Sequence, residues 1–304
     1  MANWLITGGS GYLGQHLTHI LNSSSHQTNR RMFAPNRRDL DLSRDVASLA
    51  DAIAAIEPDV AIHLAGRVPP CSAEELLRVN AAGTGCLLEA LRRVGKPIRV
   101  VLAGSAAELG PVPVERLPVA EDWECRPTTA YGLSKLMATT AALAMPAPIE
   151  AITARLFNPI GPGASDRQAF GRFARLLAAA PKNAELFRLT AGDLDASRDF
   201  LDVRDAAHAL IQLAERGEPG RVYHVGSGES LRVRDGLDEL IRLSGRNVEV
   251  IEDRSRFDPL APRDSRANSR LIRDRTGWTP TISWRQSLRD LWDWARLSNA
   301  PAPD

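Results

Sequence analysis

Three residues in the middle of the sequence have the types and spacing needed for proton transfer. Tyr131 and Lys135 are four positions apart, which places both side chains on one face of a helix. A phenol titrates at about pH 10 and a nearby cation favours its ionised form, so this pair could exchange a proton at neutral pH. Ser105 follows the apolar run Val100–Ala103 and could hydrogen-bond the reacting oxygen. A partly buried tyrosine beside a surface lysine is the plain alternative, and the presence of Ser105 favours the catalytic interpretation.

Lysine is scarce in this chain. Of 38 basic residues only Lys96, Lys135 and Lys182 are lysines. An ammonium is a compact point charge that suits a phenol or ribose hydroxyls, whereas a guanidinium is a bulky fork. This scarcity singles out Lys135.

A glycine-rich stretch, Thr7–Gly14, lies between an expected strand and an expected helix. Its glycines have the spacing G-x-x-G-x-x-G, a relative of the dinucleotide fingerprint. Such glycines permit a tight turn and bring backbone N–H groups close to a pyrophosphate. The predicted cofactor contacts in this loop are Gly8, Gly11, Tyr12, Leu13 and Gly14. A turn with only a structural role is the alternative.

The end of the expected second strand bears on the choice of cofactor. An acidic residue there would bond the adenosine ribose of NAD, but the chain reads Pro35-Asn36-Arg37-Arg38, with no carboxylate before Asp39. Arg37 and Arg38 suit a 2′-phosphate, so NADP(H) is predicted as the preferred cofactor and NAD(H) is the alternative. Asp41 and Leu42 are expected on the adenine side.

Short apolar runs alternate with longer helical stretches in the first half of the chain. The expected strands are Trp4–Thr7, Met32–Ala34, Val60–Leu64, Ile98–Ala103 and Ile149–Leu156. The expected helices are Tyr12–Asn22, Asp45–Ile56, Ala73–Val94 and Tyr131–Ala144. This alternation predicts an α/β fold with a doubly wound, Rossmann-type parallel sheet.

The pattern changes after Asn158, which predicts a smaller C-terminal lobe for the substrate. Residues 1–157 with 193–226 are expected to form the NAD(P)-binding domain. Residues 158–192 with 227–304 are expected to form the second, smaller lobe. Near the end, the amphipathic stretch Ser287–Leu297 carries Trp292 and Trp294, which we interpret as core residues.

Composition excludes several classes of protein. The 304 residues are 44% hydrophobic and 25% charged with a net charge of +1, which argues against a disordered chain or a basic nucleic-acid-binding body. Three cysteines without close spacing indicate free thiols in a reducing compartment. No apolar run is long enough to span a membrane. We therefore expect a cytoplasmic protein with no nucleic-acid or membrane partner and no metal.

Longer motifs extend these signals over nearly the whole chain. They are Pro58–Gly66, Asn80–Thr84, Gly104–Gly110, Arg155–Gly163, Gly192–Asp205, Val222–Gly228 and Thr276–Pro280. With the glycine loop and Tyr131–Lys135, the sequence resembles the extended short-chain dehydrogenase/reductase family of NAD(P)-dependent nucleotide-sugar epimerases, dehydratases and reductases. The amino-acid sequences of the segments Gly104–Gly110 and Gly192–Phe200 are most similar to those of the GDP-4-dehydro-6-deoxy-D-mannose reductases of that family.

The resemblance implies roles for particular residues. Ser105, Tyr131 and Lys135 would be catalytic and Asn80 would support the site. The implied cofactor site also includes Leu64, Ala65, Gly66, Phe157 and Ile160. Core packing is the alternative for Phe157 and for His63, which could also line the nicotinamide pocket.

The implied substrate contacts are Glu108, Asn158, Arg198 and Arg256. Asn158 would lie near the phosphates of a nucleotide sugar and Arg198 would bind its pyrophosphate, for which a bidentate guanidinium is suited. The alternative for Arg198 is a salt bridge with Asp199 or Asp202. Arg256 is less well matched, because Phe257 stands where the family usually has proline.

Two departures from the family narrow the implied activity. Ala106 and Ala107 stand where dehydratases carry an acidic pair, and Leu109 stands where epimerases and many reductases carry tyrosine. The implied reaction is NADP(H)-dependent reduction of a GDP- or dTDP-linked 4-keto-6-deoxyhexose, with hydride from the nicotinamide and a proton from Tyr131. The alternatives are an epimerase with tightly bound NAD, a reductase of a small ketone, and a cofactor-binding scaffold without turnover.

The resemblance also implies a homodimer formed through the helices Ala73–Val94 and Tyr131–Ala144. The apolar residues concerned are Leu76, Leu87, Leu88, Leu91, Leu136 and Met137. These side chains could equally belong to the intramolecular core.

Overall fold

The structure is a computed structural model that describes residues 1–24, 29–36, 38–42, 44–181, 186–257 and 262–298, without the side chains of Ser24 and Arg256. Its centre is a six-stranded sheet in the order β10-β5-β4-β3-β1-β2. The strands are β1 (Ala2–Thr7), β2 (Arg30–Phe33), β3 (Val60–His63), β4 (Ile98–Ser105), β5 (Ile149–Leu156) and β10 (Arg221–Val225). All of their pairings are parallel. The predicted doubly wound α/β fold is confirmed.

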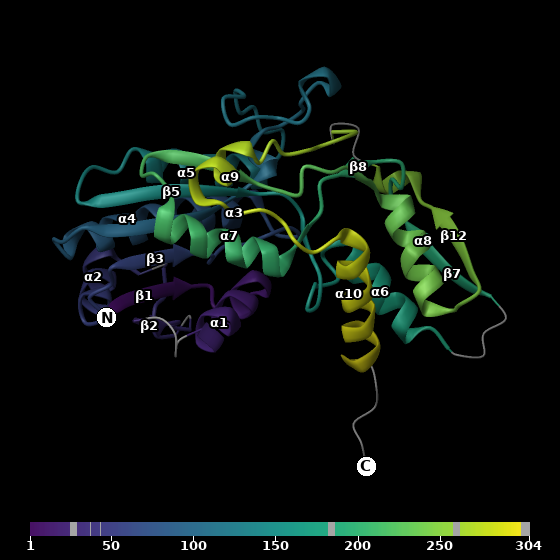
Figure 1. The fold of residues 1–304 in the computed structure, drawn as a ribbon, viewed down its shortest axis with the longest axis horizontal. Helices are drawn as coiled ribbons and strands as arrows, with labels where there is room; N and C mark the ends of the chain where they lie inside the picture. Colours follow the sequence, from purple (N-terminus) through teal and green to yellow (C-terminus); the bar gives the residue numbers. More distant parts are fainter. Residues whose placement is uncertain (25–28, 37, 43, 182–185, 258–261, 299–304) are drawn as a thin grey trace, which may run out of the picture.

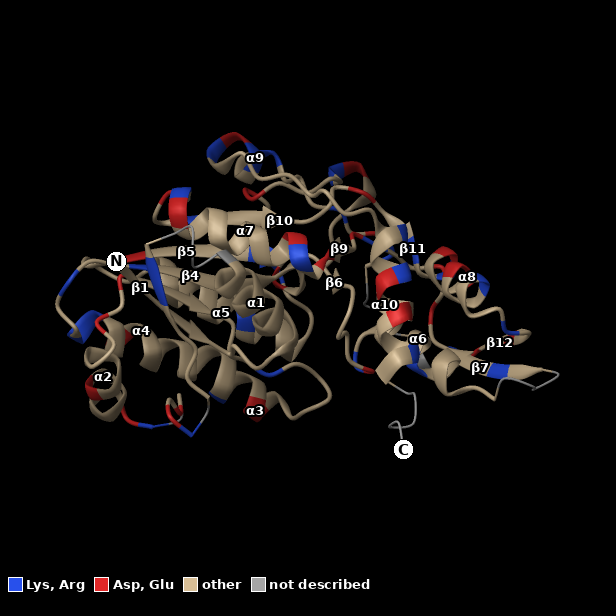
Figure 2. Cartoon of the chain, turned by 60° about the horizontal axis from the view of Figure 1, so that its bottom comes forward, with Lys and Arg blue, Asp and Glu red and all other residues tan. Residues whose placement is uncertain are grey.

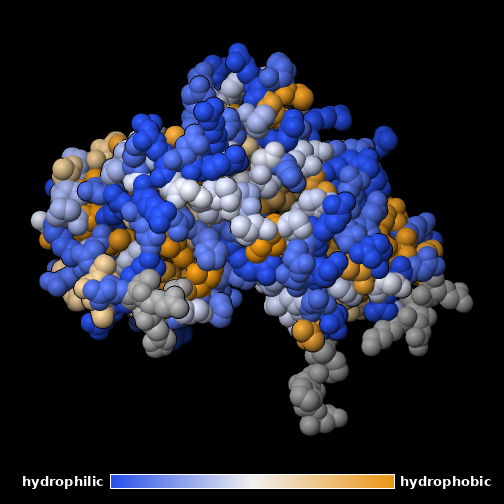
Figure 3. All heavy atoms as spheres, viewed as in Figure 1, coloured by the Kyte–Doolittle hydropathy of each residue, from blue (hydrophilic) through white to orange (hydrophobic). Residues whose placement is uncertain are grey.

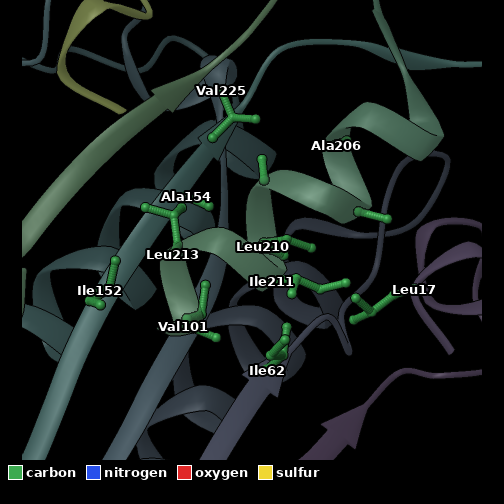
Figure 4. Packing of buried hydrophobic residues seen from close by; sticks show 14 of the residues in the cluster. Leu17, Ile62, Val101, Ile152, Ala154, Ala206, Leu210, Ile211, Leu213 and Val225 are labelled. Carbon is green, nitrogen blue, oxygen red and sulfur yellow. The ribbon is translucent and has the colours of Figure 1, made fainter. Parts of the chain in front are cut away.

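Helices cover both faces of this sheet (Figure 1). One face carries α1 (Tyr12–Ser24) and α7 (Val203–Arg216), and the other carries α2 (Val46–Ala54), α4 (Gly83–Arg93) and α5 (Ala130–Leu143). Successive strand residues alternate between the two cores. Figure 4 shows Leu210 and Leu213 of α7 packed over Val101, Ile152 and Ala154. Burial on both faces explains why these strands are almost continuously apolar.

The expected single helix over residues 73–94 is divided into three parts. A short α3 (Ala73–Leu76) runs into the π-helical segment η1 (Leu77–Ala82) and then into α4. The π-helical turn contains Asn80, whose buried amide is bonded to backbone outside the helix. A π turn of this kind often marks a functional site.

The second lobe packs three helices against a short parallel pair of strands. These elements are α6 (Ala169–Ala179), α8 (Val233–Ser244), α10 (Trp284–Ser298), β7 (Phe187–Ala191) and β12 (Val248–Glu252). Trp292 and Trp294 are partly buried against the core of this lobe, and the Arg175 guanidinium lies 4.6 Å from the Trp294 ring. Their interpretation as core residues is confirmed. The elements α8, β7 and β12 are not among those predicted from the sequence.

One C-terminal segment packs on the first lobe, although the sequence pattern places it in the second. Ile272 of α9 (Arg270–Thr276) and Trp278 are buried in the core between α7 and the sheet. The Trp278 indole donates to the Asp205 carbonyl at 3.1 Å. Residues 227–304 therefore divide between the lobes, because the apolar side chains around α9 complete the core over α7. Conversely, Leu194 falls in the range 193–226 expected for the first lobe but packs in the core of the second.

Short strand pairs connect the two lobes. They are β6 (Pro159–Ile160) with β9 (Leu201–Asp202), and β8 (Ser197–Arg198) with β11 (Leu231–Arg232). Figure 3 shows that the surface is hollowed between the lobes along its lower edge.

Many surface arginines form ion pairs with acidic residues. In Figure 2 blue and red residues occur together on α8, α9 and α10. In the arginine-dense stretch of residues 254–275, Arg266 pairs with Asp264, Arg270 with Asp274 and Arg275 with Glu218. Within the described residues, no helix is both long and apolar enough to cross a membrane.

Candidate active site

Ser105, Tyr131 and Lys135 meet at the carboxyl edge of the sheet. Ser105 is the last residue of β4, and Tyr131 lies in the first turn of α5, which Thr129 caps by accepting from the Gly132 N–H at 3.0 Å. Lys135 lies one turn further and donates from Nζ to the Ala103 carbonyl. Ligands of doubly wound sheets bind at this edge.

Burial sets the proton affinities of this group. Burial raises the pKa of the Tyr131 phenol, while a hydrogen bond with Ser105 lowers it and the negative charge of Glu108 raises it further. Burial lowers the pKa of the Lys135 ammonium, and Glu108 opposes that effect. Ser105, for which the sequence predicts only a bond to the reacting oxygen, thus also affects the proton of Tyr131.

Asn80 supports α5 from η1. Its Nδ2 donates to the Arg67 carbonyl and to Ser134 Oγ, each at 3.0 Å, and its Oδ1 accepts from the Arg67 N–H at 2.7 Å. Ser134 Oγ in turn donates to the Tyr131 carbonyl at 2.8 Å. Asn80 therefore acts on Tyr131 through the backbone of the helix, with its side chain bonded to Arg67 and Ser134.

The glycine loop is a close backbone cradle. Gly8 has a φ of +74°, and a Cβ at Gly14 would lie 2.1 Å from the Gly8 carbonyl oxygen. A Cβ at Gly8 would lie 2.5 Å from the backbone nitrogen of Ala65, at the end of β3. Gly11 is exposed, so the backbone at the start of α1 is open to a ligand. This cradle fits a dinucleotide pyrophosphate, which binds backbone N–H groups at a helix N-terminus.

Other predicted cofactor residues lie at varying depths. Leu13 and Leu64 pack against the core under α7, and Leu42 packs against the opposite core. Asp41 is half-buried, whereas Gly66 and Arg38 are exposed. Arg37 lies outside the described residues.

Tyr12 joins the cradle to the second lobe. Its hydroxyl donates to the Gly161 carbonyl at 3.2 Å, and burial raises its pKa. His16, one turn further along α1, bonds the Pro162 carbonyl at 2.9 Å. The phenol of Tyr12 is therefore directed toward the Gly161 segment.

Phe157, Ile160 and His63 are core residues. Phe157 is fully buried beside Leu109 and Val119, and Ile160 packs in the second lobe. His63 bonds Thr7 Oγ1 at 2.6 Å and Thr84 Oγ1 at 3.0 Å, and burial lowers its pKa to about 3, so the ring is neutral. All three side chains are buried, and the contacts expected between them and the cofactor stay predictions.

Arg198 and Asn158 lie at the junction of the lobes. The Asn158 amide donates to the Asp199 carbonyl at 2.8 Å, and the Arg198 guanidinium donates to the Ser197 carbonyl at 2.7 Å. Burial lowers the pKa of Arg198, while Asp193 and Asp264 raise it.

The two carboxylates considered as alternative partners of Arg198 have other partners. Asp199 accepts from the backbone N–H groups of Ser227, Gly228 and Ala267. Asp202 binds Arg204 and Ser287. The bonds described for Asp199 and Asp202 therefore do not include Arg198, and its contact with a substrate pyrophosphate stays a prediction.

Glu108 and Arg256 differ from what the sequence predicts for them. Glu108 is completely buried, and its carboxylate accepts from Arg155 at 3.0 Å and from the Ser105 N–H at 2.7 Å. It therefore faces the protein interior, and the expectation that it contacts substrate is corrected. Arg256 ends the short turn η4 (Arg254–Arg256), and its side chain lies outside the described part of the chain.

Arg155 and His224 are site residues that were not predicted from the sequence. Arg155 contacts both Glu108 and His224 behind Ser105. The available signal was a charged residue inside the apolar run Ile149–Leu156, since a buried charge requires a partner.

Comparison with known proteins yields close relatives. Residues 4–226 match the NAD dependent epimerase/dehydratase family. The chain is 35% identical to the GDP-6-deoxy-D-mannose reductase of Pseudomonas aeruginosa, over 95% of this chain and 96% of that protein. It is 30% identical to the dTDP-6-deoxy-L-talose 4-dehydrogenase (NAD(P)(+)) of Kitasatospora kifunensis, over 94% and 93%. The structure of RMD from Pseudomonas aeruginosa complexed with NADPH superposes with a TM-score of 0.87 at 30% identity, covering 98% of this chain and all of that one.

We predict that Gly14→Ala abolishes tight NADPH binding. The new Cβ would lie 2.1 Å from the Gly8 carbonyl oxygen, so the cradle must open. Titration by NADPH fluorescence should show a loss of affinity of at least roughly tenfold, because a backbone cradle has to match the pyrophosphate closely.

Gly85→Ala is the matched control. Gly85 lies in α4, and a Cβ added there would meet no neighbouring heavy atom within 4 Å, so this variant should bind NADPH as the parent protein does. Equal affinities for the two variants, with both folded by circular dichroism, would contradict the cradle assignment.

Proposed function

The chain belongs to the NAD dependent epimerase/dehydratase family of extended short-chain dehydrogenases/reductases, and on that premise we propose that it reduces the keto group of a nucleotide-linked 4-keto-6-deoxyhexose. The observation that carries the proposal is the meeting of Ser105, Tyr131 and Lys135 at the sheet edge that also holds the glycine cradle. The first lobe would bind NADPH and the second would bind the nucleotide sugar. The named activities of the two relatives agree with this class of reaction.

The protein's own residues supply the proton and hold the reacting oxygen. The reduced nicotinamide, when bound, supplies the hydride that reaches the carbonyl carbon. Tyr131 gives its phenolic proton to the carbonyl oxygen, and Ser105 hydrogen-bonds the same oxygen. Because burial raises the pKa of Tyr131, the phenol is protonated at neutral pH, as a proton donor must be. Lys135 would bond the ribose and stabilise the phenolate left after transfer.

The residues after Ser105 argue against dehydration. An elimination requires an acid and a base beside the sugar, and Ala106 and Ala107 supply neither. The next residue, Glu108, is buried and engaged by Arg155. Reduction needs only one proton donor, and Tyr131 suffices for it.

Arg198 is our proposed ligand for the substrate pyrophosphate. Its guanidinium is half-buried at the junction of the lobes, and Asp199 and Asp202, the two carboxylates considered as alternative partners, are engaged elsewhere. A partly desolvated guanidinium binds phosphate oxygens with strong, charge-assisted bonds. We propose a GDP-linked sugar as substrate because the 35% identical relative is named for one, with a dTDP-linked sugar as the second choice.

We predict that Tyr131→Phe lowers the rate of ketosugar reduction by about 10²- to 10⁴-fold, since it removes the proton donor. NADPH binding should change little, because only the hydroxyl is lost. The assay follows NADPH consumption with GDP- and dTDP-linked 4-keto-6-deoxyhexoses. Near-parental rates for Tyr131→Phe would contradict the assignment, and conversion without net NADPH consumption would instead identify an epimerase.

We propose NADPH as the preferred cofactor. No carboxylate lies between the end of β2 at Phe33 and Arg38, and Arg38 is exposed with its backbone N–H bonded to Asn36 Oδ1 at 2.8 Å. The exposed Arg38 is therefore accessible to a 2′-phosphate.

We expect Arg38→Ala to raise the KM for NADPH roughly tenfold and to leave the KM for NADH unchanged, because one charge-assisted contact is lost. Arg93→Ala, an exposed arginine on α4, is the control and should affect neither. An equal effect of Arg38→Ala on the KM values of both cofactors would show that Arg38 does not bind the 2′-phosphate.

We also propose a homodimer formed through α5 in a reducing, cytoplasmic setting. Leu133 and Met137, one turn apart on α5, are 44% and 47% exposed. In contrast, Leu76, Leu87, Leu88 and Leu91 are buried within the chain's own core, so they do not form such an interface. Leu136 is half-buried. All three cysteines are free thiols.

We predict that Met137→Glu converts the dimer to a monomer, because the carboxylate would be buried in the interface without a partner. Light scattering after size exclusion measures the mass. Leu297→Glu, a change at a 66% exposed leucine of α10, should leave the mass unaltered. A monomeric parent protein would refute the dimer.

A further inference from the structure

An ion pair lies completely buried directly behind Ser105. The Glu108 side chain is 0% exposed and that of Arg155 is 3% exposed. Arg155 Nε and one terminal nitrogen each donate to Glu108 Oε2 at 3.0 Å. Buried charges are costly unless fully paired, so a pair of this kind needs an explanation beyond stability.

The second oxygen of Glu108 holds Ser105. Oε1 accepts from the Ser105 N–H at 2.7 Å, while Ser105 Oγ accepts from the Ala107 N–H at 3.2 Å. Ser105 and Glu108 thereby form a capping box at the N-terminus of the short turn η2 (Ala106–Glu108). A Cβ at Gly104 would lie 2.6 Å from Oε1, so the strand must have glycine there for the carboxylate to reach.

Arg155 is itself held from the opposite side. Its remaining terminal nitrogen donates to His224 Nε2 at 3.0 Å. Burial lowers the pKa of His224 to about 3, so the ring is neutral and its Nδ1–H donates to the Val119 carbonyl at 3.0 Å. The guanidinium therefore has a fixed position on β5.

We propose that Glu108 and Arg155 are positioning residues for the reduction: Glu108 fixes Ser105, and Arg155 balances the carboxylate charge that would otherwise act on Tyr131. This inference rests on the proposed function for its catalytic meaning, while the contacts that join Ser105, Glu108 and Arg155 stand on the geometry. Neither residue would contact substrate. The negative charge of Glu108 raises the pKa of both Tyr131 and Lys135, in accordance with this coupling.

Several titratable groups pack around this cluster from different elements. They are Lys135 on α5, His224 on β10, and Glu121 and Cys125 from the segment between β4 and α5. His63 on β3 lies near Lys135. His63 and His224 are neutral, so they contribute no charge near neutral pH. Glu121 is bonded to the His224 N–H at 2.8 Å, and burial raises its pKa.

The test compares E108Q, R155Q and the double variant E108Q/R155Q with NADP⁺ bound. The amide introduced by E108Q keeps an oxygen for the Ser105 N–H but removes the charge. The ionisation of Tyr131 is followed by ultraviolet difference titration, each variant being referred to the same variant with Tyr131→Phe. This readout needs no turnover, so it remains valid even if the proposed substrate is wrong.

The two single variants should shift the Tyr131 midpoint in opposite directions. E108Q leaves Arg155 unbalanced, which favours the phenolate and moves the midpoint down by about one pH unit. R155Q leaves the carboxylate unbalanced and moves the midpoint up by a similar amount. In the double variant the two effects cancel, and the midpoint returns to the parental value. A purely structural role would lower activity without this pattern.

The reduction rate gives the matching kinetic result. Because Tyr131 must be protonated to donate, kcat/KM declines as the pH is raised through the Tyr131 midpoint. In E108Q this decline should begin at a lower pH than in the parent, and in R155Q at a higher pH. Absence of ketosugar reduction by the parent would refute the proposed function alone. Unchanged midpoints, or shifts of both single variants in one direction, would refute the positioning pair alone.

Two further variants, R99Q and R155K, serve as controls. R99Q removes the charge of Arg99 on β4, which pairs with Glu150 on the adjacent strand β5. This variant should leave the Tyr131 midpoint unchanged. R155K keeps the positive charge while losing the two-point contact, so it should keep the parental midpoint with a lower kcat. If a single variant does not fold, R155K and the double variant E108Q/R155Q still test the proposal. A shift of the Tyr131 midpoint in either of them would overturn it.

Discussion

The arrangement of the site depends on how closely α5 approaches the end of β4. A Cβ at Gly132 would lie 2.2 Å from the Ala107 carbonyl oxygen, so only glycine permits this contact. The approach places Lys135 against the Ala103 carbonyl and Tyr131 beside Ser105. Burial of the Tyr131 phenol and the Lys135 ammonium then follows, which raises the pKa of the phenol and lowers that of the ammonium. A wider helix–strand separation would admit water and weaken these effects.

Close polar contacts also govern the junction of the two lobes. Asp202 caps α7, binds Arg204 and accepts from Ser287 of α10 at 2.6 Å. Arg204 also reaches Asp290 of α10 at 2.7 Å. Tyr12 adds a bond from the cofactor cradle to Gly161. The two lobes are thus joined by directional polar bonds.

Much of this could be predicted from the sequence, because the signals are local. Strand and helix periodicity located the sheet, as in the apolar run that forms β5, and glycine spacing located the cradle. The i to i+4 spacing of Tyr131 and Lys135 specified their common helix face. Family motifs then suggested the reaction. Local sequence patterns therefore predict the positions of these strands, helices and the glycine loop.

Long-range partners were decided only by the tertiary structure. The sequence marked Glu108 as a substrate contact, yet its partner Arg155 is 47 residues away on a different strand, and only the β4–β5 pairing brings the two together. Phe157 and Ile160 lie in a functional motif but pack inward, since burial depends on which cores surround a strand end. For the same reason the segment around α9 packs on the first lobe, although the sequence pattern places residues 227–304 in the second. Local sequence determined the elements and the types of chemistry; three-dimensional packing determined which charges meet and which side chains are buried.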